Sequence, residues 1–529
     1  MAKALSYQPL PDFGVNGLNT QSNPSTLDSS WLTSGDNIVL RESGRISFRK
    51  GFKQKVVPSG VAIGSLVEHN DQGTNKIFAS HGTSIYTIDF TSPNAAFPSS
   101  GADVKRTVAG TTSDWQFVDF NKRLHCFHSG ATPQRYDGSL SSGSKWSAHA
   151  TQPASITTFD PSCGMGFYGR IWCGGVTEEK DVLFYSNILD GDDWTGGSAA
   201  AIDLKNVWGT DEIVAIAPFY GKLVIFGKKN IAIYNSPETV GSLAIDEVIR
   251  GVGCISRDSV QAIGDDLVFL SSTGLRSLLR TTEKDKLPLN DLSLNIKDTL
   301  IRNIGQSTKV KSVYVESEGV YIMSFVEKNI NYVFDFKHIT PNNVPRVTTW
   351  SFNNDREPSS LAYTTLYGLL IGQKDGSLAG YEGYHDTDLA WVSSAASYTN
   401  SPFTSDISSI WIPLGQSVSS SILKRMILVL GGGSGATLGL KWYKDFSATP
   451  SLTTSINLRP ATTGSTALWG NATSLYGTSK FTPIYGLQEY KTPLSGSAKH
   501  LKINMSIESN GFDASIQDLT LLHKEGKIR

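Results

Sequence analysis

The sequence predicts an all-β fold, a β-propeller of six or seven blades with a C-terminal β-sandwich-like domain. Three observations predict it. A β-rich unit of roughly fifty residues recurs along the middle of the chain. The 529 residues include 50 glycines, which suit many tight turns. Apolar residues mostly alternate at period two, whereas helical periodicity is scarce.

The recurring unit consists of an apolar strand, a tight turn and a second apolar strand. Its copies can be aligned on the residue that opens the second strand, and neighbouring copies are then 44 to 53 residues apart. A β-only unit of this length is typical of propeller blades, and closing a ring of blades leaves only short sheet edges. The seven aligned residues are Ile77, Leu124, Ile171, Leu223, Leu267, Val320 and Leu369. Three copies share nearly the same turn: Phe120-Asn121-Lys122-Arg123-Leu124, Phe167-Tyr168-Gly169-Arg170-Ile171 and Phe219-Tyr220-Gly221-Lys222-Leu223.

Composition divides the chain into three parts. Residues 1–60 form an irregular arm that ends in a predicted hairpin, with strands Asn37–Arg41 and Arg45–Phe48 joined through Ser43-Gly44. Residues 61–385 carry the repeats and form the predicted propeller, with one short helix expected over Ser293–Ile304.

Residues 386–529 form the predicted C-terminal β-sandwich-like domain. They begin with a connecting segment in which serine and threonine dominate residues 392–422. Short alternating strands then follow at the spacing of a sandwich. The predicted strands are Ile422–Leu430, Leu438–Tyr443, Thr453–Leu458, Leu501–Ile507 and Ala514–Leu522.

Charge and cysteine content limit the function classes. The chain has 47 basic and 48 acidic residues, so a net charge of −1 argues against a surface that grips nucleic-acid phosphates. Four cysteines without a CxxC pair predict buried free thiols of a protein made in a reducing cytoplasm. The longest apolar run, Met426–Leu430, is too short to cross a bilayer, and the N-terminus lacks the apolar stretch of a signal peptide. We therefore expect no membrane insertion.

Three stretches could carry chemistry, and each favours a structural interpretation. The run Gly431–Gly435 contains a serine but lies between strands, so it predicts a turn and not a nucleophile elbow. Cys126 and His128 share one strand face and could offer two metal ligands, but no second pair follows. The acidic stretch Asp190–Trp194 lacks the closing glutamate of a calcium loop. The sequence predicts no enzyme, no catalytic residue, no cofactor and no metal site.

Short phrases at both ends resemble the tail nozzle, or tail hub (DNA-stabilisation), proteins of short-tailed bacteriophages. The N-terminal phrases are Gly17-Leu18-Asn19-Thr20, Asp36-Asn37, Gly44-Arg45 and Arg49-Lys50-Gly51-Phe52. The C-terminal phrases are Lys424–Val429, Leu440–Asp445 and Phe512–Leu521. Their order along one chain carries the resemblance, because each phrase is short.

This resemblance implies a structural virion protein of the phage tail, made in the bacterial host cytoplasm. Such proteins form homo-hexameric rings below the portal and its head-to-tail adaptor. The ring extends the DNA channel, retains the packaged genome and lets it exit on infection. Its partners are the adaptor ring, tail fibre or spike proteins, and passing double-stranded DNA without sequence specificity. The resemblance assigns no residue to the lining of the channel.

Other functions remain open from the sequence. A receptor- or glycan-binding protein associated with the tail fibre or spike is the main alternative, because 10% of the residues are aromatic. A propeller hydrolase would need carboxylates or arginines that converge above the blades. A cellular scaffold propeller would have a similar repeat length.

Overall fold

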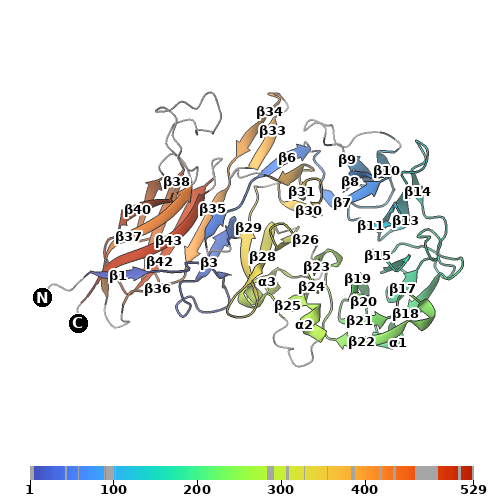
Figure 1. Cartoon of the computed structure of the whole chain (residues 1–529), viewed down its shortest axis with the longest axis horizontal. Helices are drawn as coiled ribbons and strands as arrows, with labels where there is room; N and C mark the ends of the chain where they lie inside the picture. The colour runs from blue at the N-terminus through green and yellow to red at the C-terminus, as the bar shows by residue number, and fades with distance from the viewer. Residues whose placement is uncertain are drawn as a thin grey trace, which may run out of the picture.

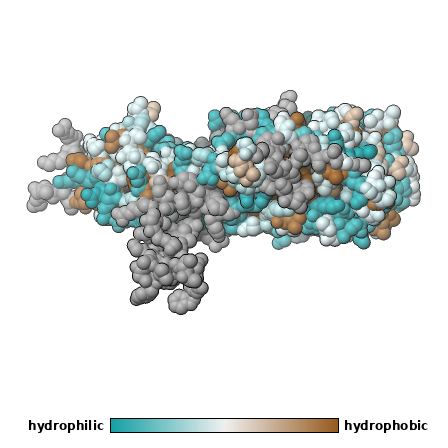
Figure 2. Space-filling view, turned by 90° about the horizontal axis from the view of Figure 1, so that it is seen from above, coloured by the Kyte–Doolittle hydropathy of each residue, from teal (hydrophilic) through white to brown (hydrophobic). Residues whose placement is uncertain are grey.

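The computed structural model contains a ring of β-sheets at one end and two packed sheets at the other (Figure 1). Strands β1 (Ser6–Pro9) and β43 (Ala514–Glu525) both lie at the end with the packed sheets. Seen from above, the molecule is long and shallow, and hydrophobic residues are scattered among hydrophilic ones (Figure 2). The structure describes residues 5–41, 45–56, 59–88, 90, 101, 103–282, 291–305, 309–326, 328–353, 356–382, 388–392, 394–415, 420–432, 436–458, 487–509 and 514–526.

The ring is a β-propeller, as the sequence predicts. Within the described residues it has six four-stranded blades and one three-stranded blade, numbered here in chain order. The first four blades are β7–β10 (Ile63–Asp71, Thr74–His81, Ser84–Ile88, Lys105–Thr107), β11–β14 (Gln116–Phe120, Arg123–His128, Ala131–Tyr136, Trp146–Ala148), β15–β18 (Cys163–Phe167, Arg170–Gly174, Val182–Tyr185, Ala200–Asp203) and β19–β22 (Ile213–Phe219, Lys222–Gly227, Asn230–Asn235, Ala244–Arg250). The fifth is β23–β25 (Gln261–Ile263, Asp266–Ser271, Gly274–Ser277), the sixth is β26–β29 (Val310–Val315, Val320–Phe325, Ile330–Ile339, Pro345–Trp350), and the seventh is β30–β32 (Pro358–Thr364, Gly368–Gln373, Leu378–Tyr381) with β6 (Phe52–Val56).

The repeat predicted from the sequence matches the blades. Each of the seven aligned residues, from Ile77 to Leu369, lies in the second strand of a blade. That strand is sandwiched between neighbouring blades, and so both of its faces are apolar. Separate buried clusters fill six of the seven spaces between consecutive blades; Trp172 and Leu223, for example, pack between the third and fourth. Between the fifth and sixth blades, Leu270 and Tyr321 belong to the large core that also includes the sandwich. These clusters are the reason why a blade needs its neighbours.

The ring is closed by a strand from the N-terminal part of the chain. Strand β6 pairs antiparallel with β32, with Phe52 opposite Tyr381 and Val56 opposite Leu378. The first and last repeats are therefore fastened by a strand that precedes both. Contacts between β30 and β7 complete the circle.

The second part of the molecule is a sandwich of two sheets. One sheet contains β1 (Ser6–Pro9), β4 (Ile38–Leu40), β5 (Ile46–Phe48), β37 (Ser421–Gly432), β40 (Leu487–Pro493), β41 (Ser497–Ala498) and β43 (Ala514–Glu525). The other contains β2 (Gly17–Leu18), β3 (Trp31–Asp36), β35 (Thr404–Ser409), β36 (Ile412–Pro413), β38 (Thr437–Lys444), β39 (Leu452–Asn457) and β42 (His500–Glu508). Alternate residues such as Leu428, Leu440 and Met505 face inward and share one buried core.

The two parts are joined through a continuous sheet. Strands β2 and β3 pair with β29 of the sixth blade, and β3 also pairs with β35 of the sandwich. The resulting 11-stranded sheet runs from a propeller blade into the sandwich. Residues 1–60, which the sequence sets apart as an arm, thus supply strands to three sheets. The strand pairing of the predicted hairpin is confirmed, because β4 pairs antiparallel with β5. Its predicted turn at Ser43-Gly44 lies outside the described residues.

The serine- and threonine-rich segment contains more strand than its pattern indicates. The sequence places the first strand at Ile422, whereas β33 (Asp388–Val392) and β34 (Ser397–Ser401) already form a hairpin beside β6. Strand β35 is held by pairing with β3 and β42, and small polar residues at such central positions leave no apolar alternation to detect.

Helices are few and short. The predicted helix over Ser293–Ile304 is confirmed as a 3₁₀ turn followed by α3 (Lys297–Asn303). The other α-helices of the described residues are α1 (Lys205–Trp208) and α2 (Leu278–Thr282). Among those residues no helix is both long and apolar enough to span a bilayer. Part of the predicted Gly431–Gly435 turn, Gly433–Gly435, lies outside the described residues.

Candidate functional site

The junction between propeller and sandwich is the first candidate site, and Asn37 lies at its centre. Asn37 has a φ of +55°, a left-handed conformation that asparagine tolerates better than most residues. Its Nδ2 donates to the Thr404 carbonyl at 2.7 Å and to the Ser351 hydroxyl at 2.9 Å. Its Oδ1 accepts a hydrogen bond from Nε of Arg49 at 2.9 Å. Asn37 therefore joins the N-terminal strands, the sixth blade and the sandwich.

Arg49 is fully buried at this junction and is completely paired. Its guanidinium forms two hydrogen bonds with the Asp388 carboxylate, at 3.1 and 3.3 Å. The guanidinium carbon lies 3.6 Å from the centre of the Phe403 ring. A planar guanidinium suits both contacts, and a buried arginine needs such pairing to offset its desolvation. Asp388 also accepts from the backbone N–H of Phe52 at 2.9 Å.

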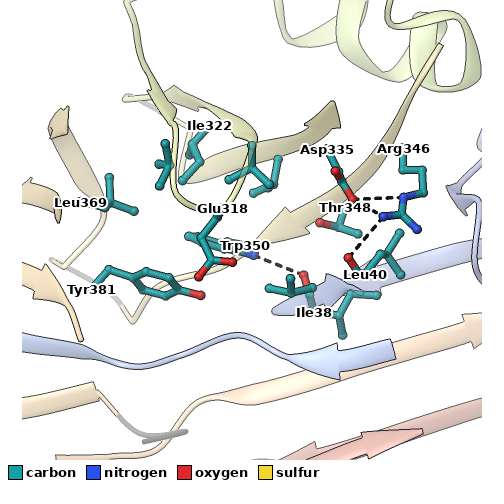
Figure 3. A pocket seen from close by; sticks show the side chains of 14 residues that line it. Ile38, Leu40, Glu318, Ile322, Asp335, Arg346, Thr348, Trp350, Leu369 and Tyr381 are labelled. Atoms are coloured by element: carbon teal, nitrogen blue, oxygen red, sulfur yellow. Dashed lines mark hydrogen bonds and ion pairs between the residues drawn. The ribbon is translucent and has the colours of Figure 1, made fainter. Parts of the chain in front are cut away.

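A second buried ion pair closes the other side of the junction. Arg346 pairs with Asp335 and donates to the Leu40 carbonyl at 3.3 Å (Figure 3). Beside it, Trp350 donates to the Ile38 carbonyl at 3.4 Å. The apolar hollow between these groups has a volume of about 20 Å³. That volume holds about one water molecule, so the hollow is too small to be a ligand site.

The centre of the propeller is the second candidate site. Asp114, Arg257, Asp258 and Lys311 form a cluster of four ion pairs there. Asp114 lies 3.1 Å from Arg257 and 2.6 Å from Lys311, while Asp258 lies 2.9 Å from Arg257 and 2.6 Å from Lys311. Asp114 precedes the second blade, whereas the other three residues belong to the fifth and sixth. The second blade is not a neighbour of the fifth or the sixth, so these contacts cross the ring centre and close it.

The charges in this cluster balance one another. Burial alone would raise the pKa of Asp258, but Arg257 and Lys311 outweigh burial and hold that pKa well below its usual value. Asp114 behaves in the same way, because Arg257 and Lys311 outweigh its partial burial and lower its pKa. Two hollows of about 230 and 260 Å³ lie against the cluster, and both are lined by Arg257, Asp258 and Lys311. With two acids and two bases already paired, the cluster offers no free charge to a ligand.

A buried group of His125, His149 and Asp192 lies between the second and third blades. Their nitrogen and oxygen atoms all lie within 4.8 Å of one another, which is close enough to share a metal ion. Nε1–H of Trp194 donates to Nδ1 of His149 at 3.0 Å. Nε2 of His149 must then carry that ring's proton, and it lies 3.0 Å from Nδ1 of His125. A nitrogen that carries a proton cannot bind a metal, so this hydrogen-bond chain favours a metal-free role.

The electrostatics of this group agree with that interpretation. Burial, followed by repulsion from Arg123 and Arg135, lowers the pKa of His125 to about 3. Burial and the neighbouring His125 lower the pKa of His149 well below its usual value. Arg135 pairs directly with Oδ2 of Asp192, whereas Oδ1, which faces the two imidazoles, is buried without a hydrogen-bond partner, and burial raises the pKa of this carboxyl despite Arg135 and Arg123. Both imidazoles are therefore neutral at physiological pH.

The candidate residues named from the sequence lie around this group without forming a site together. Cys126 points into the apolar cluster between the first two blades, and burial raises its pKa. His128 Nε2 lies 3.0 Å from the backbone N–H of Thr112. Asp190 and Asp193 accept backbone N–H groups within their own turn. All four cysteines are buried free thiols, as predicted.

Comparisons with known proteins identify no family for this chain. No protein-family model and no curated protein matches the chain. Similar solved structures include the Neurospora crassa Pan2 WD40 domain, which covers 63% of this chain and 96% of its own at 9% identity, with a TM-score of 0.39. The WD40 β-propeller domain of Doa1 (62% and 96% covered, 10% identity, TM-score 0.34) and YCF48 bound to D1 peptide (62% and 94%, 10%, 0.37) are also similar. At these TM-scores the similarities carry no inference about function.

Proposed function

We propose that this chain is a structural, non-enzymatic subunit of a phage tail nozzle, or tail hub, that extends the DNA channel as a homo-hexameric ring. The observation that carries the proposal is the junction. Asn37, Arg49 and Phe52 belong to the phrases that resemble nozzle proteins, and all three lie in it. Three residues of the N-terminal phrases thus take part in the contacts that hold propeller and sandwich in one body, as a subunit under mechanical load needs.

The closed propeller centre defines how such a subunit would serve a channel. Ion pairs cross the ring at Asp114 and Lys311, so a duplex cannot pass through one copy of the chain. In the proposed assembly DNA passes between copies, through a lumen that the ring encloses. The net charge of −1 suits passage without tight binding to phosphates.

Quantitative mass spectrometry of purified virus particles tests this function. We expect one copy of this chain for every two portal subunits, as in a six-fold ring below a twelve-fold portal. Absence of the chain from the particles would refute a virion role. A copy number that is a multiple of three and well above that ratio would instead assign the chain to fibres or spikes.

A receptor- or glycan-binding tail protein is the second candidate. Tyr168 and Tyr220 favour it, because both expose an aromatic ring at the tip of a propeller turn. A glycan array probed with the purified chain separates the two functions. Binding that is lost when both tyrosines are replaced by asparagine would support this candidate.

A further inference from the structure

Three large apolar residues on one face of the propeller adopt left-handed backbone conformations. Tyr168 and Tyr220 have φ values of +45° and +47°, each as the first residue of a two-residue turn, and Leu189 has a φ of +57°. Asparagine or glycine occupies such positions at less conformational cost. Their side chains are nevertheless 46%, 63% and 64% exposed. The fold thus accepts backbone strain to present apolar side chains to solvent.

These residues form one continuous surface, which we call the tyrosine face and which also includes Ile188. The Tyr168 hydroxyl lies 3.4 Å from where a Cβ on Gly221 would be, so the two turns touch. The backbone N–H of Leu189 donates to the Gly169 carbonyl at 2.7 Å, which ties the neighbouring loop to the same turn. Ile188 is 55% exposed beside them. Contiguous exposed apolar side chains of this kind mark an interaction surface.

Two basic residues near the tyrosine face have partners within their own blades. Lys222 pairs with Asp246 at 2.6 Å. Arg170 is buried and donates to the Ser186 carbonyl at 2.7 Å. The rim keeps exposed Lys122 and Asp190, one charge of each sign. The complementary surface is therefore apolar and uncharged.

The same chain offers such a surface on strand β1. This strand and the residue before it, Leu5-Ser6-Tyr7-Gln8-Pro9, carry no charged side chain. Leu5 and Tyr7 are 53% and 64% exposed. Among the described residues β1 pairs only with β43, so its outer edge is open. A net charge of −1 gives copies of the chain little mutual repulsion.

We propose that the tyrosine face binds strand β1 of a second copy of this chain in a head-to-tail contact. Two different surfaces meet, so each copy keeps one free surface of each kind, and repeated contacts generate a ring or a filament. The proposal rests on the proposed ring function for its biological setting. The two are tested separately, since particle stoichiometry decides the function and purified protein decides the contact.

Sedimentation velocity of the purified full chain, over about a hundredfold range of concentration, tests the contact. We expect the wild type to associate. A face variant (Tyr168→Asn with Tyr220→Asn) and a strand variant (Tyr7→Ser) should each associate at least about tenfold more weakly when alone. An equimolar mixture of the two variants should form dimers that grow no further, because only one intact surface of each kind remains.

Matched controls separate this outcome from misfolding. Asparagine suits the left-handed turn position, so the face variant should keep the wild-type melting temperature; Leu189→Asn provides a second variant on the same grounds. Ile339 is 63% exposed on another blade, and Ile339→Ser should associate like the wild type. A monomeric wild type throughout the range, a strand variant that associates normally, or a mixture that forms no dimer would each overturn the proposal. Glycan binding by a monomeric wild type would assign the face to a carbohydrate instead.

Discussion

At the residue scale, Arg49 is the junction residue whose loss we expect to cost most, because it is buried and its carboxylate partner Asp388 is also buried. Arg49→Met would leave the charge of Asp388 without its partner, and removing one member of such a pair costs about 3–5 kcal/mol. We expect this loss in the free energy of unfolding, measured by urea denaturation. Arg250→Met changes an exposed arginine and should cost less than about 0.5 kcal/mol. Equal losses in the two variants would contradict a structural role for Arg49.

The histidine pair predicts how stability depends on pH. Unfolded His125 takes up a proton near its ordinary pKa of 6.5, whereas folded His125 does so only near 3. The unfolded state therefore binds more protons between these values, so stability falls as the pH drops from about 6.5 toward 3. At pH 5 this one group should already cost about 2 kcal/mol.

The measurement is the free energy of unfolding at a series of pH values, with His125→Gln as the comparison. Glutamine does not titrate, so the variant should lose stability less steeply between pH 6.5 and 5. His81 lies on another blade, and burial lowers its pKa too, although it is only about half buried. His81→Gln should reduce the slope less than His125→Gln, and equal slopes in the wild type and His125→Gln would exclude this role.

The residue scale also shows what the sequence could not reveal. His125 and His149 lie in one blade, but Asp192 and Trp194 come from a loop of the next, so no local spacing connects them. The pattern draws attention to Cys126 and His128, which share a strand face, while the buried contact between blades uses His125 on the opposite face. Only the alignment of one blade against its neighbour brings these side chains together.

At the scale of single elements, strand β2 depends on a glycine that lets two backbones meet. Gly17 has a φ of +73°, and a Cβ there would lie 2.6 Å from the Val347 carbonyl oxygen. Gly17→Ala should lose roughly 1 kcal/mol from backbone strain and roughly 1–3 kcal/mol more from the steric contact. Gly73 has a φ of +89°, and a Cβ there would meet no atom beyond its chain neighbours within 4 Å. Gly73→Ala should therefore lose only the roughly 1 kcal/mol that comes from backbone strain. Equal melting temperatures for the two variants would contradict the close approach.

The blades could be predicted from the sequence, whereas the sandwich pairing could not. A blade consists of strands that follow one another in the chain and pair as hairpins. Its alternating apolar pattern therefore appears in consecutive residues, as at Leu223 and Val320. Strand β1 instead pairs with β43, where Tyr7 lies opposite Leu522, more than five hundred residues away. Neither strand has a residue pattern that indicates its partner strand. The serine-rich β35 is also defined by its two partner strands rather than by its own residues.

At the scale of the whole molecule, propeller and sandwich should unfold as one unit. One buried cluster includes Leu270 of the fifth blade, Tyr321 of the sixth and Trp442 of the sandwich, and the 11-stranded sheet crosses between the two parts. Cooperative units follow such shared cores. Differential scanning calorimetry should therefore give a single transition for the full chain, with equal calorimetric and van't Hoff enthalpies.

Residues 386–529 produced alone provide the complementary test. They lack β1, β4 and β5 of one sheet and β2 and β3 of the other, all of which come from the N-terminal part of the chain. We expect this fragment to show no cooperative thermal transition, because strand edges in both sheets and much of the shared apolar core would be exposed to solvent. Adding residues 1–60 through a flexible linker should restore a transition if the missing strands are the cause. A fragment that melts cooperatively by itself, or two separate transitions in the full chain, would show that the sandwich is an independent domain and that the junction does not make the subunit one body.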